Sequence, residues 1–510
     1  MQQQTVPSDS PNPIDSLAFP EFLLHFEATL KHLFHDAYDI DKLSATRGMP
    51  DAVWQGILGT NPLSVAIPAK YGGRGSAVKE VLAFLEKASY ESLPLSLFFG
   101  INIGLFLYPV SRYAQPDFAN SIFNKFLTQQ HIGGLMITEP GYGSDALSMR
   151  TSYTQHAEGY HLEGTKHWQG LSGTANYWLI AARKKMGDGS LGRDIDLFIS
   201  DQQQDGQKVS VVEDYDNQGL YMIPYGKNNI DINLPSESKL NPHSSGIKML
   251  LDTLHRSRMQ FPGMGMGFIE RMLDEALKHC SKRMVGLKNL FSMDHVQQQL
   301  SRLQAAYTLC SAMCARSSAM SALSEDLSAA GLEANSVKAV VTDLMQECAQ
   351  ITVQLLGANG YRVSNIAGRG IMDSRPFQIF EGSNEMLYTQ VAEFIIKQMK
   401  QLQEDNLFTF LNTFPLTAAS SLLFKDLLDF NVSATLPQRK LLDLGKILSR
   451  IICIGYVLDL ANNGFRDALV QNCIAMVKQE LEGLFASYKS TNTAAVVPHY
   501  KEQSDWTKFA

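Results

Sequence analysis

Apolar residues recur every three or four positions through the first quarter of the chain, the spacing of helices that bury one face. The pattern predicts helices over 19–40, 78–100 and 116–130. Between the first two, IPAKYGGRGSA at 67–77 is a Pro/Gly loop that no helix crosses. Residues 17–130 are therefore expected to form a helical domain. They follow a polar, Pro-rich tail at 1–16 that is expected to be disordered.

The pattern changes from residue 131 to 245, where short alternating runs are separated by Gly, Asn and Asp. This spacing is typical of a small antiparallel β domain, with strands expected at 159–164, 177–183, 195–200 and 208–213.

Helical periodicity returns from residue 246 to 400 and continues through 401–510. The expected fold is thus α+β: a helical domain, a middle β domain, a C-terminal helical bundle and a helical extension. Helices are predicted over 269–287, 295–323, 336–357, 425–430, 439–461 and 467–489.

The extension contains one markedly apolar helix face. Its polar side carries few basic residues, whereas a helix lying on a membrane surface has a Lys/Arg-rich polar face. We therefore expect this face to pack against the body of the protein. It consists of Ile447, Ile451, Ile454, Leu458 and Ala461.

Composition restricts the possible functions. The chain has 510 residues, 45% of them hydrophobic and 19% charged, which is typical of a folded protein of several domains. A net charge of -7 argues against nucleic-acid binding. The N-terminus lacks the features of a secretory signal, and no apolar run is expected to approach the ~20 residues that span a bilayer, since the longest candidate, 451–461, is short and contains Asp459. A cytoplasmic protein without membrane contact is expected.

Cysteine and histidine give no sign of a metal site. Cys310 and Cys314 are four residues apart in a predicted helix, but no CxxC or HExxH pattern accompanies them. We expect reduced core thiols and no bound metal.

Glycines at 263, 265 and 267, in PGMGMGF, invite a dinucleotide-binding interpretation. The fingerprint requires G-x-G-x-x-G after a strand, but here the third glycine is one position early and the preceding segment is helical. Small residues at a close helix crossing are the favoured interpretation. Signatures of P-loop NTPases and α/β-hydrolases are also missing from the sequence.

Two stretches carry candidate chemistry. In the first, GGLMITEPGYGSDALSM at 133–149, a turn rich in backbone and hydroxyl donors surrounds Thr138, Ser144 and Asp145, which suits a polar ligand. Trp168 on the next strand is placed to stack on a flat ring. The alternative is an ordinary β domain with turns and one buried Trp.

The second stretch, 354–387, contains PFQIFEGSNEML. Glu381 follows an apolar, aromatic run, and a carboxylate held against apolar walls is suited to act as a base. The alternative is an acidic residue at a helix start, with Ser383 as the N-cap.

Together these motifs resemble the acyl-CoA dehydrogenase family over residues 17–400. The order is IPAKYGG in a helical domain, ITEPGYGSD and EGTKHW in a β domain, then QLLGANG and IFEGSNE in a second helical domain.

The resemblance implies FAD as cofactor. In the family the turn faces the flavin edge, the tryptophan lies against the flavin ring, an arginine reaches the diphosphate, and a segment of a neighbouring subunit approaches the adenine half. The implied cofactor-binding residues are Leu135, Met136, Ile137, Thr138, Gly143, Ser144, Trp168, Gly170, Arg283, Gln354, Leu355, Leu356, Gly357, Ala358, Ser383, Asn384 and Glu385.

The resemblance also implies a reaction. Glu381 matches the family's base, which removes the α-proton of an acyl thioester while a β-hydride passes to flavin N5, giving a trans-2-enoyl thioester. Ser144, Arg258 and Gly382 match positions at the substrate. The implied partners are an acyl-CoA or acyl carrier protein substrate, a flavoprotein electron acceptor and further copies in a homodimer or homotetramer.

The chain departs from the family pattern at four places. Gly170 stands where a Thr or Ser hydroxyl is usual, and Met372 precedes Asp373 in place of an arginine. Val285–Gly286–Leu287 replaces Thr-Phe-Gly, and Val296 replaces a glutamine. Two alternatives therefore stay open: a flavoprotein oxidase or monooxygenase on the same fold, or a scaffold without catalysis.

Overall fold

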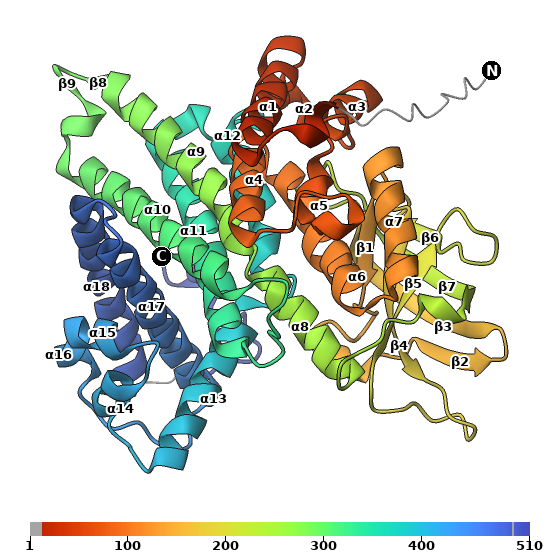
Figure 1. Cartoon of the computed structure of the whole chain (residues 1–510). Coiled ribbons are helices and arrows are strands. Elements are labelled where there is room, and N and C mark those ends of the chain that lie inside the picture. Colours follow the sequence, from red (N-terminus) through yellow and green to blue (C-terminus); the bar gives the residue numbers. More distant parts are fainter. Residues whose placement is uncertain (1–12, 492–493) are drawn as a thin grey trace.

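The computed structural model describes residues 13–491 and 494–510. Most of the predicted N-terminal tail lies outside these residues, and Pro13–Ser16 form a short 3-10 helix, η1. Figure 1 shows a β-sheet at one end of the molecule, long helices through the middle, and the helices of the extension at the other end. The predicted sequence of helical, β and helical regions is confirmed.

The N-terminal region is helical as predicted, and its apolar faces meet in a core that contains Phe22, Phe26, Phe84 and Phe99. The Pro/Gly loop at 67–77 contains one 3-10 turn, η4 (Ala69–Tyr71), ended by Gly72 at φ 85°, and it follows directly on another, η3 (Pro62–Ala66). The other elements are α1 (Phe19–Lys31), the π-helix η2 (His32–Ala37), α2 (Ile40–Leu43), α3 (Asp51–Leu58), α4 (Val78–Glu91), α5 (Leu93–Asn102), the π-helix η5 (Ile103–Leu107), α6 (Tyr108–Tyr113) and α7 (Pro116–Gln129).

One expectation about apolar runs is wrong. Leu93–Tyr113, which spans α5, η5 and α6, is a 21-residue helix with a mean hydropathy of 1.7. By length and composition alone, this segment is long and apolar enough to cross a membrane. Because 94% of its most apolar window is buried inside the protein, its hydropathy is accounted for by its place in the core.

The middle region forms a seven-stranded sheet within the described residues, in the order β1-β4-β2-β3-β7-β6, with β5 paired to β4. Most pairings are antiparallel as predicted, but β4 runs parallel to both β1 and β2. The strands are β1 (Gly133–Met136), β2 (Ser152–His156), β3 (Gly159–Gly170), β4 (Tyr177–Lys184), β5 (Asp196–Asp201), β6 (Ser210–Asp214) and β7 (Tyr225–Pro235).

The C-terminal helices pack closely where small residues allow it. A Cβ added to Gly263 or Gly267 would lie 2.9 Å from the Leu82 carbonyl oxygen or 1.9 Å from that of Glu86, so α9 crosses α4 almost in backbone contact. This confirms the helix-crossing interpretation of PGMGMGF. The elements are α8 (Gly246–Arg258), α9 (Phe261–Lys282), β8 (Met284–Val285), β9 (Lys288–Asn289), α10 (Asp294–Met320), α11 (Gly331–Leu356), η9 (Gly357–Asn359), α12 (Ile366–Ser374), η10 (Arg375–Gln378) and α13 (Asn384–Leu402).

All six cysteines of the chain lie in the described part and are free thiols. Cys310 is buried and Cys314 is half-buried, so the expectation of reduced core thiols is confirmed.

The extension packs on the body of the protein, as predicted. Ile447, Ile451 and Ile454 of α17 are fully buried, and α17 lies against α10, α11 and α13. The extension comprises α14 (Leu407–Thr413), α15 (Ala418–Ser421), α16 (Lys425–Leu428), α17 (Gln438–Asn462) and α18 (Asp467–Lys489).

Candidate active site

Glu381 lies in the short segment that joins η10 to α13. Its backbone has φ 52° and that of Gly382 has φ 93°, so two consecutive residues occupy the left-handed region. A non-glycine residue held there is strained by about 1–3 kcal/mol, and such strain persists only where the surroundings enforce it. The α13 helix begins directly after, with Ser383 as its N-cap at the Met386 N–H, as the sequence indicated. Glu381 itself precedes the helix and does not cap it.

The carboxylate of Glu381 has one satisfied and one free oxygen. Ser257 at the end of α8 donates its hydroxyl to Oε1 at 2.9 Å, and Oε2 is buried without a hydrogen-bond partner. Burial raises the pKa of Glu381, and the charges of Arg258 and Lys338 and the Ser257 hydrogen bond partly offset that rise. A shielded carboxylate with a free oxygen is poised to accept a proton.

Two buried cations fix the backbone of this turn. Arg258 donates from Nε at 3.1 Å and from Nη2 at 2.8 Å to the carbonyl oxygen of Glu381. Lys338 of α11 donates to the carbonyl oxygen of Gly382 at 2.8 Å and to Asn384 Oδ1 at 2.9 Å. Its side chain has no exposed surface, and burial lowers the pKa of Lys338 to about 7. Both side chains thus hold the backbone of the turn in place.

A second group of residues gathers at the end of β1. The N–H of His167 donates to the carbonyl oxygen of Thr138 at 3.0 Å, which places Trp168 of β3 beside the loop that follows β1. A buried ion pair fixes that loop: Lys166 Nζ lies 2.8 Å from Glu139 Oε1 and also donates to the Ile137 carbonyl oxygen. Burial lowers the pKa of Lys166 to about 8.

Trp168 presents an apolar ring to solvent. A bulge between His167 and Gln169 gives Trp168 φ 61°, and its side chain remains 53% exposed. One part of the ring packs on Tyr215 at a centroid distance of 4.4 Å. The expected alternative, one buried core Trp, is therefore wrong for this residue.

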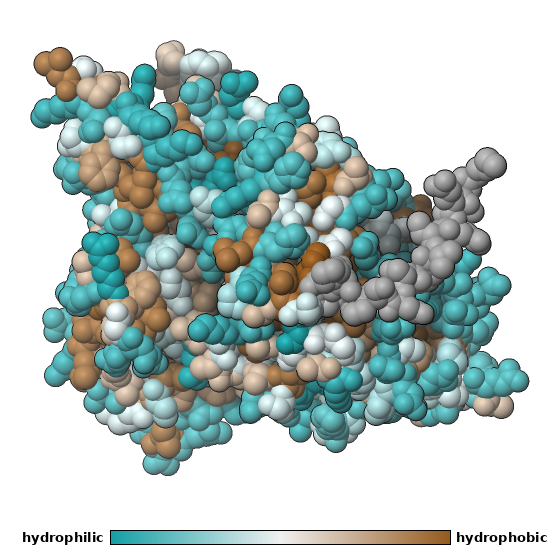
Figure 2. All heavy atoms as spheres, turned by 45° about the horizontal axis from the view of Figure 1, so that its top comes forward, coloured by the Kyte–Doolittle hydropathy of each residue, from teal (hydrophilic) through white to brown (hydrophobic). Residues whose placement is uncertain are grey.

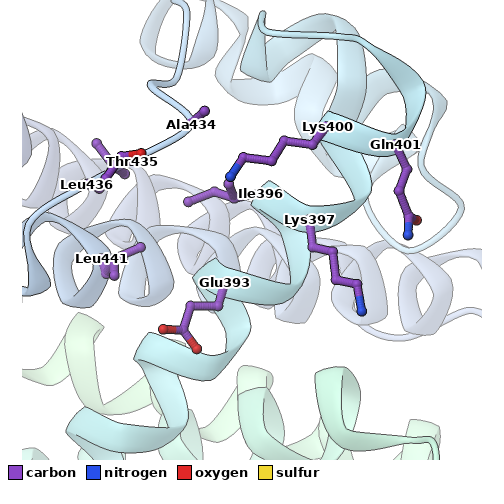
Figure 3. Close-up of a pocket in the computed structure, with 9 residues that line it drawn as sticks. All are labelled: Glu393, Ile396, Lys397, Lys400, Gln401, Ala434, Thr435, Leu436 and Leu441. Atoms are coloured by element: carbon purple, nitrogen blue, oxygen red, sulfur yellow. The ribbon is translucent and has the colours of Figure 1, made fainter.

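A groove in the described structure lies elsewhere. It has a volume of about 480 Å³ and separates α13 from residues 434–436 of the extension (Figure 3). Lys397 and Lys400 lie on its α13 side with Glu393, at least twelve positions beyond Glu381. The groove is thus separate from the Glu381 turn.

Three family models match consecutive parts of the chain. The N-terminal, middle and C-terminal domains of acyl-CoA dehydrogenase match residues 29–130, 134–231 and 244–396. These matches cover more than half of the chain and follow the three structural regions in order. The chain belongs to the acyl-CoA dehydrogenase family. This family consists of FAD-binding oxidoreductases.

Relatives of this acyl-CoA dehydrogenase family member are distant in sequence. Mitochondrial isovaleryl-CoA dehydrogenase of Solanum tuberosum is 22% identical over 395 residues, which cover 75% of this chain and 92% of the relative. Butyryl-CoA dehydrogenase of Megasphaera elsdenii has the same fold, with a TM-score of 0.65 at 19% identity over 76% of this chain and all of that chain.

An acyl-CoA dehydrogenase of Bacillus anthracis, solved in complex with FAD, matches more of the chain. It has a TM-score of 0.73 at 16% identity and covers 96% of this chain and 92% of its own. The extension therefore has a counterpart in at least one solved structure of the family.

The loop after β1 fits the FAD that the family binds. Gly143 and Ser144 are exposed, and among the described residues the hydroxyls of Thr138 and Ser144 make no hydrogen bond. With the exposed ring of Trp168 beside them, they provide free donors next to a flat apolar surface. That combination suits a flavin, which has a polar edge and a flat face. Leu135 and Met136 are buried in β1 and Ile137 is half-buried, so only their backbone is positioned for contact.

Gly170 has no room for a side chain. An added Cβ would lie 2.8 Å from Ile101 Cδ1 and 3.1 Å from Ile223 Cγ2. The usual family hydroxyl is therefore missing here, and its space is occupied by the protein's own apolar side chains.

Within a single chain, Arg283 lies far from the loop after β1. Arg283 is exposed at the end of α9, directly before the β8–β9 hairpin, which lies at the opposite end of the molecule from the sheet (Figure 1). The hairpin also exposes apolar side chains, with Leu287 at 98%, and Figure 2 shows apolar residues at this projecting corner.

The segment from Gln354 to Ala358 lies at the C-terminal end of α11 and in η9. Gln354, Gly357 and Ala358 are exposed, Leu355 is buried, and Leu356 is half-buried. No hydrogen bond among the described residues joins this segment to the loop after β1. Its contact with a cofactor of a neighbouring subunit stays a prediction.

Asn384 and Arg258 were expected to contact ligands, but in the structure their side chains bind other groups of the protein. Asn384 is buried, and its amide donates to the Ala339 carbonyl oxygen and Asp343 while accepting from Lys338, so its side chain holds the turn. Arg258 likewise binds the Glu381 carbonyl and Asn335 Oδ1 at 2.6 Å. Glu385, by contrast, is exposed.

The departures from the family pattern at Val296 and Met372 lie on helices of the C-terminal region. Val296 is buried in α10 and Met372 is 46% exposed on α12. Asp373 accepts the Leu220 N–H at 2.6 Å and so joins α12 to the β domain. Burial raises the pKa of Asp373 to about 6.

Sequence reasoning missed Ser257 and Lys338. Neither belongs to a motif, since Ser257 lies 124 positions from Glu381 and Lys338 lies 44 positions from Gly382. A lysine within the apolar pattern of 332–345 was the only available signal.

Proposed function

We propose that the protein catalyses the FAD-dependent α,β-dehydrogenation of an acyl thioester, carried on CoA or on an acyl carrier protein. The observation that carries this proposal is the Glu381 carboxylate, buried with Oε2 free and Oε1 held by Ser257. Membership of the acyl-CoA dehydrogenase family supports the reaction class.

The chain's own residues account for proton removal. Glu381 accepts the α-proton on Oε2, while Ser257 and the charges of Arg258 and Lys338 favour its ionised form against the effect of burial. The backbone N–H of Glu381 has no acceptor among the described residues, so it is free to donate to the thioester carbonyl as negative charge develops there. FAD, when bound beside Trp168, supplies the acceptor for the β-hydride. The product is a trans-2-enoyl thioester.

The partners and location follow as part of the proposal. We infer that electrons pass from the reduced enzyme to an electron-transferring flavoprotein in the cytoplasm. We further infer a homodimer or homotetramer, because Arg283 directly precedes the β8–β9 hairpin, which lies at the other end of the molecule from the sheet, so its expected FAD contact would be made on another copy (Figure 1).

The test uses the holoenzyme under anaerobic conditions. A panel of acyl-CoAs and acyl carrier protein thioesters is titrated in, and bleaching of the flavin absorbance is followed. Glu381→Gln is expected to retain FAD and lose bleaching, whereas Glu393→Gln, a change at an exposed glutamate further along α13, behaves as wild type. Full bleaching of the Glu381→Gln enzyme would disprove the assignment of the base.

A second candidate, a flavoprotein oxidase or monooxygenase, is favoured by Gly170, where the usual hydroxyl is replaced by packing of Ile101 and Ile223. A flavin that no thioester bleaches, but that consumes oxygen with another substrate, would support it. A protein that takes up no FAD would instead support the remaining alternative, a scaffold without catalysis.

A further inference from the structure

A single carboxylate on α11 holds both ends of the segment that carries Glu381. Asp343 Oδ1 accepts from Gln378 Nε2 at 2.7 Å, on the residue that ends η10, and from Asn384 Nδ2 at 2.7 Å, on the residue that begins α13. Because these donors flank Glu381 by three residues on each side, the position of Asp343 sets the span of the turn.

The other oxygen of Asp343 is held from the extension. Tyr388 of α13 donates its hydroxyl to Asp343 Oδ2 at 2.6 Å. Arg450 of α17 lies with Nη2 at 3.5 Å from the same oxygen and donates from Nη1 to the Tyr388 hydroxyl. Arg450 is 5% exposed, and its Nε binds Glu480 of α18 at 3.0 Å.

The contacts form a continuous polar path in which Arg450, Asn384 and Lys338 are buried and Glu480 and Asp343 are half-buried. From Glu480 the path passes through Arg450 and Asp343 to Asn384. Asn384 accepts from Lys338, which holds the Gly382 carbonyl oxygen beside the base. The outer half of this path belongs to α17 and α18, outside the part of the chain that the family models match, which ends at residue 396.

The charges explain why the path needs the extension. Among the described residues, Arg450 is the cation that forms an ion pair with Asp343. Without that cation the half-buried Asp343 carboxylate loses its charge partner, so its hydrogen-bonded neighbours are expected to rearrange as more water reaches it. The groups that would move first are Asn384 and Gln378, the two ends of the Glu381 segment.

We propose that Arg450 is a positioning residue, through which the C-terminal extension fixes the place of the Glu381 carboxylate. The inference rests on the proposed function for its catalytic readout. If Arg450 were purely stabilising, its replacement would lower the free energy of unfolding without changing the turn.

The experiment compares four variants of the full-length holoenzyme. Arg450→Met removes the cation, Arg450→Lys keeps charge without the guanidinium fork, and Tyr388→Phe removes one hydroxyl from the path. Arg439→Met is the matched control, because Arg439 lies on the same helix but binds only within the extension, at the Ser487 and Ser490 carbonyl oxygens. We measure kcat and KM for the best thioester, and hydrogen–deuterium exchange of the peptide spanning 379–387.

Arg450→Met is expected to lower kcat about 10-fold or more, since small misplacements of a catalytic group cost that much, with KM changed less than about twofold. Exchange of the 379–387 amides is expected to accelerate. Arg450→Lys recovers part of the loss, Tyr388→Phe shows a smaller loss of the same kind, and Arg439→Met matches wild type.

Wild-type kcat and exchange in a folded Arg450→Met enzyme would overturn the proposal, as would equal losses in Arg439→Met. If Arg450→Met does not fold, Tyr388→Phe decides by the same two readouts. If no thioester reduces the wild-type flavin, the proposed function has failed, and exchange in 379–387 alone decides whether Arg450 positions the turn.

Discussion

Lys338 donates a 2.8 Å hydrogen bond to the backbone carbonyl oxygen of Gly382 from a wholly buried position. Arg258 does the same for the preceding carbonyl, that of Glu381. Two buried basic side chains therefore hold the carbonyl groups of two successive residues, Glu381 and Gly382, whose backbones are both left-handed. The carboxylate is positioned through its backbone as well as through Ser257.

The buried Lys338 makes stability depend on pH. Its pKa is lowered from 10.5 to about 7, so between these values the folded protein has released a proton that the unfolded chain retains. The contribution of this group to the free energy of unfolding therefore rises with pH across that window. Denaturant unfolding of wild type and Lys338→Met is expected to show a difference that grows in favour of wild type as pH rises.

Lys338→Met also leaves the Gly382 carbonyl oxygen without its donor, at a cost of about 1–3 kcal/mol, whereas Asn384 Oδ1 keeps the Thr342 hydroxyl as a donor at 3.2 Å. Lys397→Met, at an exposed lysine on α13, serves as the control. A pH-independent difference between wild type and Lys338→Met would contradict the prediction.

The pH dependence of flavin reduction reports on Glu381. Burial raises its pKa above the ordinary 4.5, and the base works in its deprotonated form. The rate is thus expected to rise with pH along an acid limb above that ordinary value. Ser257→Ala removes a hydrogen bond that favours the charged form, so the limb should move to higher pH. The pH dependence is measured by stopped-flow reduction of the flavin, with Ser281→Ala as a control at an exposed serine. An acid limb that does not move in Ser257→Ala would show that Ser257 has no effect on the base.

Trp168 should contribute to FAD affinity. Its exposed ring beside the loop after β1 offers a stacking surface, worth about 0.5–1.5 kcal/mol beyond buried area. Trp168→Leu is therefore expected to weaken FAD binding by about 2- to 12-fold, measured by titrating apoprotein and following flavin fluorescence. Trp506→Leu alters another exposed tryptophan, outside the site, and should bind as wild type. Equal affinity of wild type and Trp168→Leu would rule out stacking.

Substitution of Gly170 is expected to lower the free energy of unfolding unless Ile101 is shortened as well. Gly170→Ser places Cβ 2.8 Å from Ile101 Cδ1, and such overpacking costs about 1–3 kcal/mol. Ile101→Val removes that Cδ1 atom. Chemical denaturation is expected to show the double variant as more stable than the sum of the two single losses predicts. Simple additivity would mean that Ile101 does not limit position 170.

Local sequence pattern was sufficient for much of this protein. Periodicity predicted the helical, β and helical regions, because amphipathic spacing reflects which face of an element is buried. The Gly-rich run before α9 was correctly assigned to a helix crossing, since it lacked the strand that nucleotide binding needs. Motif order indicated the family, and Glu381 and Trp168 followed from it.

Other features depend on packing between distant segments. The 21-residue apolar helix at Leu93–Tyr113 is a core element because other helices and the sheet cover it, which its composition does not reveal. The exposure of Trp168 likewise depends on a bulge in β3 and on its contact with Tyr215.

The sequence by itself determined the order of the elements and singled out Glu381 as the proposed base, because both depend on short stretches of chain. Only the tertiary structure decided what holds that base. Ser257, Lys338 and Arg450 come from three helices separated by 60 or more residues, and each is an ordinary polar residue in its own helix. Their roles arise from burial, where an unpaired charge or carbonyl is costly, so each one is fixed by the partner that folding brings to it.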